Sequence, residues 1–436
     1  MDNINPDILN IIRKYLPIKN KEKKFYGEVF SPPELVCDML DLLPKEVWSD
    51  PNLQWLDPAN GIGNFPVVVY YRLMEGLKLV IPDKKDRSKH IIEYMLYMVE
   101  LNSVNCDVCR EIFNLIDNTA EPNIINADFL EWNPNKKFDI IMGNPPYQTN
   151  LKKRGIKSTS IWELFFKKSI DILKENMYLL LIHPSSWRSP FGIRKHILDK
   201  ILELDLQYLY MCSYECSKKY FKGVSTNFDY YCLKNTVDKN NITTINDTDD
   251  NVYRKNLNIY PFIPSGKFDI FDKLIEKDTD ITVLNSCIYH IQHRYKHMSK
   301  EKSVNVIHER TTYGHDKKNM SQPKNNEYIL PCVYSISKSN EIKFWYSSID
   351  RGMFGTPKVI WANGGGGPIL DLKGEYGMTE FAYAIVDDPE VLPSIKKAME
   401  TEKFINLMRY CVFEQNHKYN WKVIKTFRRD FWKEFI

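Results

Sequence analysis

The sequence contains no hydrophobic segment long enough to cross a membrane as a helix, and its first residues do not form a secretory signal. A membrane-spanning helix needs about 20 consecutive, predominantly apolar residues, and no such run occurs among the 436 residues. We therefore expect an intracellular, cytoplasmic protein that is neither secreted nor attached to a membrane.

The sequence also has little excess of positive over negative charge. The net charge is only +4, from 60 Lys and Arg against 56 Asp and Glu. An excess this small does not indicate nucleic-acid binding by itself, so any basic surface must be local.

The nine cysteines lack the paired motifs of a structural zinc site. Cys106 and Cys109 have the C-x-x-C spacing, but they fall in a helical pattern and no second pair accompanies them. A structural zinc ion needs four ligands. We therefore expect no metal, and reduced thiols as in intracellular proteins.

The most informative stretch is 138–148, which reads FDIIMGNPPYQ. Its apolar run predicts a buried parallel strand, and two prolines stiffen the turn that follows Asn144. In open α/β sheets, ligands bind at the carboxyl ends of such strands. The Asn144 side chain and the Pro145 carbonyl offer two acceptors, and Tyr147 offers a ring, which together suit a planar amine such as that of adenine. The alternative is an ordinary strand stop in which Tyr147 packs in the core.

Three acidic residues follow three earlier predicted strands. Asp57 opens a turn that contains Gly61 and Gly63, Glu100 ends the second strand, and Asp128 precedes Phe129. Glycines permit close approach of a ligand, an acid after the second strand suits a ribose diol, and an acid beside an aromatic ring suits a purine. Each acid alone is more often a solvated turn residue, but all three before the Asn-Pro-Pro-Tyr turn indicate a ligand site. The glycine pattern is not that of a dinucleotide site.

A further candidate segment for the ligand site begins at Phe30. Ser31 precedes two prolines and Glu34, which predicts a helix N-terminus with Ser31 as its N-cap. The free N–H groups of that terminus could bind a carboxylate. The alternative is a plain capped helix.

The pattern of apolar runs predicts a mostly parallel α/β sheet with an antiparallel final strand. A polar stretch, 235–258, suggests a domain boundary. Beyond it the periodicity weakens, although residues 379–412 favour helix. We expect an N-terminal helix and link at 1–25, a first domain at 26–238 and a second at 239–436. The seven expected strands are 53–56, 94–99, 124–130, 140–142, 177–182, 206–212 and 227–233.

Residues 26–234 resemble the N6-adenine DNA methyltransferases of restriction-modification systems whose motifs run in the order cofactor, catalysis, target recognition (the gamma order). The Asn144-Pro145-Pro146-Tyr147 turn is similar to that family's catalytic motif. The resemblance implies a Rossmann-like, seven-stranded class I methyltransferase sheet whose last strand is antiparallel, and a C-terminal mixed α+β target-recognition domain. It further implies methyl transfer from S-adenosyl-L-methionine to N6 of an adenine flipped out of duplex DNA, which stacks against Tyr147 and Phe221.

The same resemblance assigns the cofactor site. Asn60 departs from the family, which usually has a small residue or Cys there. The cofactor-binding residues that the resemblance implies are Phe30, Ser31, Pro32, Asp57, Ala59, Gly61, Gly63, Glu100, Asp128, Phe129 and Asn144.

The expected partners are double-stranded DNA and, in some systems, a separate endonuclease. A basic loop after the catalytic turn could contact phosphates: Lys152, Lys153, Arg154 and Lys157. Residues 290–324 are also basic, with a solvated face as the alternative. The histidines at 290, 293 and 297 have helical spacing, but the reaction needs no metal.

Three other functions stay open. Asn-Pro-Pro-Tyr also serves methyltransferases of RNA or protein glutamine, and a catalytically inactive methylase fold could bind DNA alone. A fused restriction enzyme is disfavoured, because about 25 residues precede the first motif.

Overall fold

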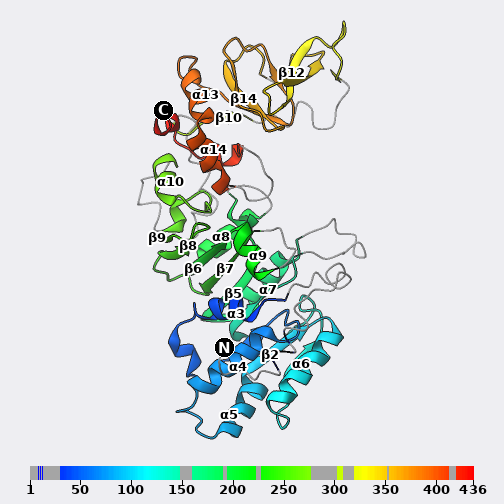
Figure 1. Ribbon diagram of the computed structural model, residues 1–436, viewed down its shortest axis with the longest axis vertical. Helices are drawn as coiled ribbons and strands as arrows, with labels where there is room; N and C mark the ends of the chain where they lie inside the picture. Colours follow the sequence, from blue (N-terminus) through cyan, green and yellow to red (C-terminus); the bar gives the residue numbers. More distant parts are fainter. Residues whose placement is uncertain are drawn as a thin grey trace. The chain divides into compact units, whose positions relative to one another are not determined.

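The computed structural model describes residues 8, 10, 12, 30–147, 160–189, 194–221, 227–275, 302–307, 319–350, 353–411 and 419–436. The chain forms two compact units (Figure 1). The first comprises Met1–Trp187 and His196–Leu257, and the second comprises Arg188–Lys195 and Asn258–Ile436.

A nine-stranded sheet organises the first unit, in the order β3-β2-β1-β4-β5-β7-β6-β8-β9. The neighbours from β3 to β5 pair in parallel. Parallel strands buried on both faces require nearly continuous apolar sequence, and β4 is buried at every position. The strands are β1 (Trp55–Asp57), β2 (Leu96–Glu100), β3 (Asn123–Asn126), β4 (Phe138–Gly143), β5 (Leu173–Pro184), β6 (Asp205–Cys212), β7 (Phe228–Lys234), β8 (Thr243–Asn246) and β9 (Val252–Lys255).

The predicted antiparallel strand is confirmed, because β7 runs antiparallel to both β5 and β6. The prediction of seven strands is too low, since β8 pairs in parallel with β6 and β9 completes that edge. Ile245 is buried, and Thr243 Oγ1 donates a hydrogen bond to Leu206 O at 2.7 Å. The polar stretch after residue 238 is thus part of the first unit, and the units divide after Leu257.

Helices cover both faces of this sheet. One core cluster joins α3, α4 and α6 to alternate positions of the strands, such as Ile140, Met142, Leu180 and Ile182. Side chains alternate between faces along a strand, so the intervening positions face the opposite side. The helical elements are α3 (Pro33–Leu40), α4 (Asn64–Gly76), α5 (Lys84–His90), a π-helix (Ile91–Met95), α6 (Ser103–Ile116), α7 (Trp162–Ile172), α8 (Lys195–Glu203) and α9 (Tyr214–Tyr220).

The second unit contains both helices and strands, in two four-stranded sheets with the orders β10-β17-β14-β15 and β11-β13-β12-β16. The prediction that 379–412 is helical is partly wrong. Residues 382–385 form β17, because they pair with both β14 and β10. The elements are α10 (Phe268–Leu274), β10 (Val306–Ile307), β11 (Met320–Ser321), β12 (Leu330–Ile336), β13 (Ile342–Ser347), β14 (Lys358–Ala362), β15 (Ile369–Asp371), β16 (Gly377–Met378), β17 (Ala382–Ile385), α13 (Leu392–Glu400), α14 (Glu402–Met408) and α15 (Trp421–Ile424).

The segment 188–195 belongs to the second unit although it precedes α8 of the first. Arg188 is buried, and its Nη1 donates to Ile263 O at 3.2 Å and to Ser265 Oγ at 3.1 Å. The Ile263 N–H in turn donates to Arg188 O. These bonds satisfy a guanidinium that would otherwise be costly to bury.

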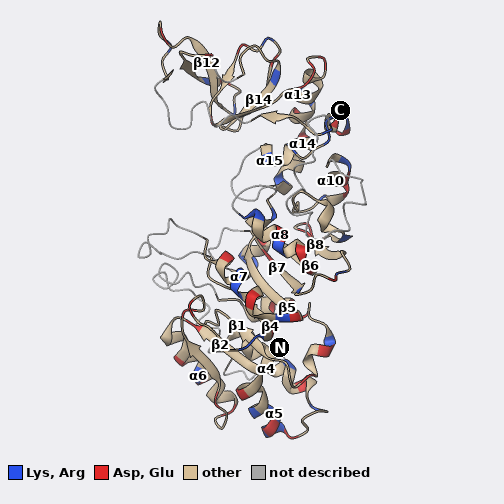
Figure 2. Cartoon of the chain, turned by 180° about the vertical axis from the view of Figure 1, so that it is seen from behind, with Lys and Arg blue, Asp and Glu red and all other residues tan. Residues whose placement is uncertain are grey.

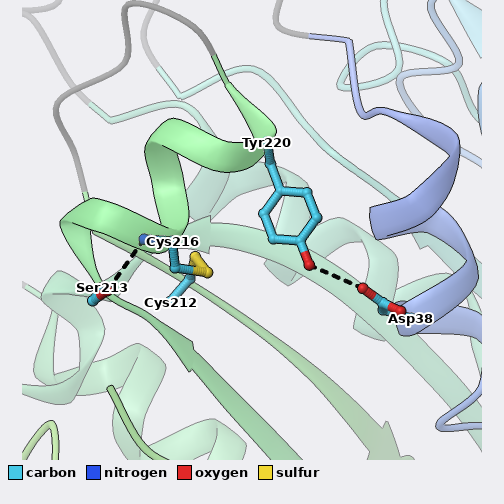
Figure 3. Close-up of a disulfide and its surroundings, with 5 residues drawn as sticks. All are labelled: Asp38, Cys212, Ser213, Cys216 and Tyr220. Carbon is cyan, nitrogen blue, oxygen red and sulfur yellow. Dashed lines mark hydrogen bonds between the residues drawn. A yellow bond between two sulfur atoms is a disulfide. The ribbon is translucent and has the colours of Figure 1, made fainter. Parts of the chain in front are cut away.

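The expectation of reduced thiols is wrong at two positions. Cys212, the last residue of β6, and Cys216, in the first turn of α9, form a disulfide bond (Figure 3). Ser213 lies between them and caps α9 by accepting the Cys216 N–H. At the other end of α9, Tyr220 donates to Asp38 Oδ2 of α3 at 3.0 Å. The free cysteines in the described residues are Cys37, Cys106, Cys109, Cys232, Cys332 and Cys411.

Among the described residues, no helix is both long and apolar enough to cross a membrane.

Candidate active site

The strand registers bring the predicted site residues to one edge of the sheet. Asp57 pairs with Met98 across β1 and β2, and Glu100 pairs with Asn126 across β2 and β3. Leu56 pairs with Ile141 across β1 and β4. The residues that follow these strands therefore share the carboxyl edge, where open α/β sheets bind ligands.

Glu100 holds the glycine turn against β2. One carboxylate oxygen accepts the Gly61 N–H at 2.7 Å, and the other accepts the Asn102 N–H at 2.7 Å. The Asn60 N–H also donates to Val99 O. These two bonds fix the Glu100 carboxylate at the carboxyl edge of β2, beside the glycine turn.

Asp57 is buried beside the same turn and accepts the Ala59 N–H at 3.1 Å. Burial, reinforced by the nearby charge of Glu100, raises the pKa of the Asp57 carboxyl to about 8. Gly143 on β4 lies so close that a Cβ there would meet Asp57 Oδ1 at 2.8 Å. The end of β4 therefore needs glycine to approach this carboxyl.

The glycine turn carries two further constraints. Gly61 has φ +57°, and a Cβ there would lie 2.7 Å from the Phe30 ring. Asn60, the residue that departs from the family pattern, is buried and donates through Nδ2 to Gly61 O and Cys109 Sγ. Its Oδ1 has no hydrogen-bond partner within the described part of the chain. A buried acceptor without a donor is costly, and a bound N–H group would satisfy it.

The prediction that Ser31 caps a helix is wrong. The N-cap of α3 is Pro32, and no side chain caps that helix. Ser31 instead joins two other segments, because its carbonyl accepts Asn64 Nδ2 at 2.7 Å and its Oγ accepts Asn144 Nδ2 at 3.2 Å. Since Nδ2 of Asn144 points at Ser31, Oδ1 of that amide must point elsewhere.

Asp128 and Phe129 lie in a turn after β3. Asp128 Oδ1 accepts the Leu130 N–H at 2.9 Å. Phe129 is only 2% exposed and stacks on Phe165 of α7, with ring centroids 5.1 Å apart. One face of Phe129 is therefore occupied, and its predicted contact with a purine stays a prediction.

The Asn-Pro-Pro-Tyr turn follows β4 directly. Pro145 is buried, whereas Asn144, Pro146 and Tyr147 are partly exposed. Tyr147 O accepts the Ile161 N–H at 3.2 Å. Burial, and secondarily the charge of Asp229, raises the pKa of the Tyr147 phenol, so the ring is neutral at physiological pH.

Phe221 directly follows α9 and is 5% exposed. Its ring meets that of Phe228 edge to face at 5.3 Å. Phe228 pairs with Pro184 at the end of β5, so Phe221 lies toward the same edge as the catalytic turn. Its predicted role as a wall for a base is not tested by these contacts.

The expected DNA contacts at Lys152, Lys153, Arg154 and Lys157 lie outside the described residues, as do the three histidines between 290 and 297. Within the described residues, basic and acidic side chains are interspersed, as on α5 (Figure 2). Arg429 near the C-terminus forms ion pairs with Asp387 and Asp388. In the described part of the chain, no cluster of three or more metal-binding side chains occurs.

The sequence analysis missed a buried cluster behind the catalytic turn. His183 stacks on Trp162 and contacts Tyr231, while Trp187 donates to Asp229 Oδ2. The available signal was a histidine at the end of a buried apolar run, followed four residues later by a tryptophan, because β5 ends at the same edge as its parallel neighbour β4.

Residues 78–206 match the sequence profile of the Eco57I restriction-modification methylase family. An uncharacterized adenine-specific methylase of Mycoplasma pneumoniae is 28% identical, over 40% of this chain and 59% of its own length. The type II methyltransferase M.HincII of Haemophilus influenzae is 24% identical, over 50% of this chain and 39% of its own. The matches thus span less than two thirds of these relatives.

Among solved structures, the Type IIL restriction-modification enzyme MmeI in complex with DNA has a similar fold. The TM-score is 0.51 at 13% sequence identity, and the similarity covers 87% of this chain and 65% of that one. This likeness concerns the fold alone. The family profile and the curated relatives confirm the resemblance drawn from the Asn-Pro-Pro-Tyr turn: the chain is similar to the adenine-specific methyltransferases of restriction-modification systems.

Proposed function

We propose that this protein transfers a methyl group from S-adenosyl-L-methionine to N6 of an adenine in a short duplex DNA sequence. The observation that carries the proposal is the orientation of Asn144. Ser31 accepts a hydrogen bond from its Nδ2, which turns Oδ1 away from Ser31. The second acceptor that we propose is the carbonyl of the next residue, Pro145. Two acceptors on a stiff turn are what a planar amine requires.

The neighbouring turn supports the choice of cofactor. The acids at the ends of β1 and β2, the close contact of Gly61 with Phe30 and the buried Oδ1 of Asn60 fit a ligand with a diol, an aromatic group and N–H donors. Bound S-adenosyl-L-methionine would supply a methyl group on a positively charged sulfur. The residues proposed to hold it are Phe30, Ser31, Pro32, Asp57, Ala59, Gly61, Gly63, Glu100, Asp128, Phe129 and Asn144.

The chain's own contribution to the reaction is positioning and electrostatics. The lone pair of the adenine amine is delocalised into the ring, so N6 is a poor nucleophile. If Asn144 Oδ1 and Pro145 O accept its two N–H groups, the nitrogen is drawn toward tetrahedral geometry and its lone pair is directed out of the ring plane. The neutral rings of Tyr147 and Phe221 would stack on a base that has left the duplex.

We further propose that the second unit recognises the DNA target, with or without a separate endonuclease in the same cell. The fold similarity to MmeI extends over 87% of this chain and therefore beyond the first unit. The position of a second unit after the sheet agrees with a reader domain that follows the catalytic one. Which side chains read bases depends on contacts with DNA.

The test is single-molecule sequencing of plasmid DNA from methylation-free cells that express either the wild type or Asn144→Ala. We expect N6-methyladenine at one short motif in the wild-type sample and none in the variant. Cofactor binding, measured by titration calorimetry, should persist in the variant, because the other proposed cofactor residues remain. Normal methylation by Asn144→Ala would overturn the role of Asn144, and no modified base in either sample would turn attention to RNA or protein substrates.

A further inference from the structure

A cluster of buried aromatic side chains lies on the α7 face of the sheet, at the end of β5. His183 stacks on Trp162 with ring centroids 4.1 Å apart and planes 15° apart. Its edge contacts are Tyr231 at 5.3 Å and Trp187 at 6.0 Å. All four side chains are at most 1% exposed. We call these four residues the His183 platform.

The hydrogen bonds of His183 identify its protonation state. Nδ1 lies 3.2 Å from Pro184 O, and Nε2 lies 3.0 Å from Tyr231 Oη. A carbonyl can only accept, so Nδ1 carries the proton and Nε2 accepts from the tyrosine. Burial lowers the pKa of His183 to about 3, so the ring is neutral. The two hydrogen bonds and the three aromatic neighbours therefore hold the neutral His183 ring in a single orientation.

The platform touches the catalytic turn through α7. Trp162 is the first residue of this helix and Ile161 is its N-cap. The Ile161 N–H donates to Tyr147 O at 3.2 Å. The stacking of Trp162 on His183 therefore fixes the helix end that holds the backbone of Tyr147.

A second connection runs through β7. Asp229 is the register partner of His183 across β5 and β7, and it is fully buried. Its Oδ2 accepts Trp187 Nε1 at 2.8 Å, and its charge contributes to the raised pKa of Tyr147. The platform is thus linked to the Tyr147 backbone through the start of α7, and the Asp229 carboxylate is near enough to the Tyr147 phenol to affect its pKa.

We propose that the His183 platform positions the catalytic turn, with His183 as a positioning residue that sets where Tyr147 meets the target base. This inference rests on the proposed function, since it names the base as the group that Tyr147 contacts. No atom of the platform needs to touch the substrate. A shift of about 1 Å at a reacting centre can lower a rate roughly 100-fold, so a rigid support behind the turn has a direct effect on turnover.

The test compares three variants of the full chain. His183→Ala removes the stacking, His183→Phe keeps a ring on Trp162 but loses both hydrogen bonds, and His90→Ala is the matched control. His90 also stacks on an aromatic ring, at 5.5 Å from Tyr94, and also bonds a carbonyl, but it lies on α5 away from the catalytic edge. If His183 only stabilised the fold, His183→Ala would lower the melting temperature but leave kcat unchanged at temperatures where the variant is folded.

Two readouts are measured. Hydrogen exchange of the peptide that contains Ile161 and Trp162 reports on the α7 terminus without any substrate. Methyl transfer to plasmid DNA reports kcat and KM for DNA. For His183→Ala we expect faster exchange at this terminus and a fall in kcat of about 10-fold or more, with cofactor affinity within about twofold of the wild type. His183→Phe should recover most of the protection, and His90→Ala should match the wild type.

The inference is overturned if His183→Ala leaves both exchange and kcat unchanged, or if it changes them no more than the control does. If His183→Ala does not fold, His183→Phe and Trp162→Phe decide the matter by the same two readouts. A wild type that modifies no DNA would overturn the proposed function. The exchange data would still decide whether the His183 platform holds the catalytic turn in place.

Discussion

Ser31 shows how one small side chain can set the geometry of a site. Its hydroxyl oxygen accepts from Asn144 Nδ2 and its carbonyl accepts from Asn64 Nδ2, so it links α4 to the catalytic turn. If Asn144 acts through Oδ1, then loss of the Ser31 hydroxyl lets the amide rotate.

We predict that Ser31→Ala lowers kcat for DNA methylation on the order of 10-fold, because the acceptor loses its orientation while the backbone contact remains. Ser49→Ala is the control, since Ser49 is exposed and its hydroxyl bonds only the nearby Glu46 carbonyl among the contacts described. An unchanged kcat in Ser31→Ala would show that Asn144 does not depend on this hydroxyl.

Asp57 gives a prediction about pH. Its pKa is raised to about 8 in the folded protein, against about 3.9 in an unfolded chain. Between these values the folded state keeps a proton that the unfolded state has lost, so the free energy of unfolding falls as pH rises. Above about pH 8 both states are ionised and the effect is constant.

We therefore predict that Asp57→Asn raises the melting temperature relative to wild type more at pH 8.5 than at pH 5. Differential scanning calorimetry at the two pH values measures the difference. Asp83→Asn is the control, because Asp83 is exposed and its pKa is lowered by the N–H groups of α5; its effect should be the same at both values. A parallel shift for Asp57→Asn would mean that its carboxyl is ionised at neutral pH.

At the residue scale, the sequence predicted where Asp57, Glu100 and Asn144 lie, whereas their roles stay predictions. Each of the three ends or directly follows an apolar run, and the carboxyl ends of parallel strands share one edge of the sheet. Ser31 was misassigned because a serine before two prolines fits local capping preferences. Its true partner lies 113 residues away, and no local pattern contains that contact.

At the scale of elements, the strands that were predicted have a local sequence pattern, whereas those that were missed depend on contacts distant in the sequence. β4 was predicted because its own residues form a continuous apolar run. β8 and β9 were missed because their sequences are largely polar. The pairing of β8 with β6, and of β9 with β8, depends on the assembled sheet. Likewise, Ala382–Ile385 forms a strand through pairing with β10 and β14 rather than through its own preference.

The disulfide gives a prediction for α9. This helix has seven residues, too few to be stable alone, and Cys212–Cys216 closes its first turn onto β6. A loop this short constrains the unfolded chain by roughly 2 kcal/mol. We predict that dithiothreitol, which reduces the disulfide to two thiols and is itself oxidised to a cyclic disulfide, lowers the wild-type free energy of unfolding by up to about this amount.

Urea unfolding with and without dithiothreitol tests this. The double variant Cys212→Ala, Cys216→Ala should not respond to the reductant. Cys37→Ala, which removes a free cysteine, should respond as the wild type does. Equal responses in all three proteins would show that this bond does not stabilise α9.

At the scale of the whole molecule, the position of the boundary has a measurable result. A fragment of residues 1–238 lacks β8 and β9 and exposes the edge of β6, whereas a fragment of residues 1–257 keeps them. Unpaired strand edges promote aggregation. We predict that the longer fragment is more soluble and unfolds at a higher temperature, as measured by light scattering and circular dichroism.

Both fragments lack the partners of Arg188, so their comparison isolates the effect of the two strands. Equal solubility and equal unfolding temperature would place the limit of the first unit nearer residue 238 than Leu257 and would contradict the nine-stranded sheet as one cooperative element.

The burial of Arg188 has a consequence for synthesis on the ribosome. Its hydrogen-bond partner Ile263 lies 75 residues further along the chain, so at about 5–20 residues per second it emerges roughly 4 to 15 seconds later. During that interval the guanidinium remains hydrated. The first unit must therefore form while Arg188 still lacks this partner, and the second unit receives a buried side chain from a residue that is translated before most of its sequence.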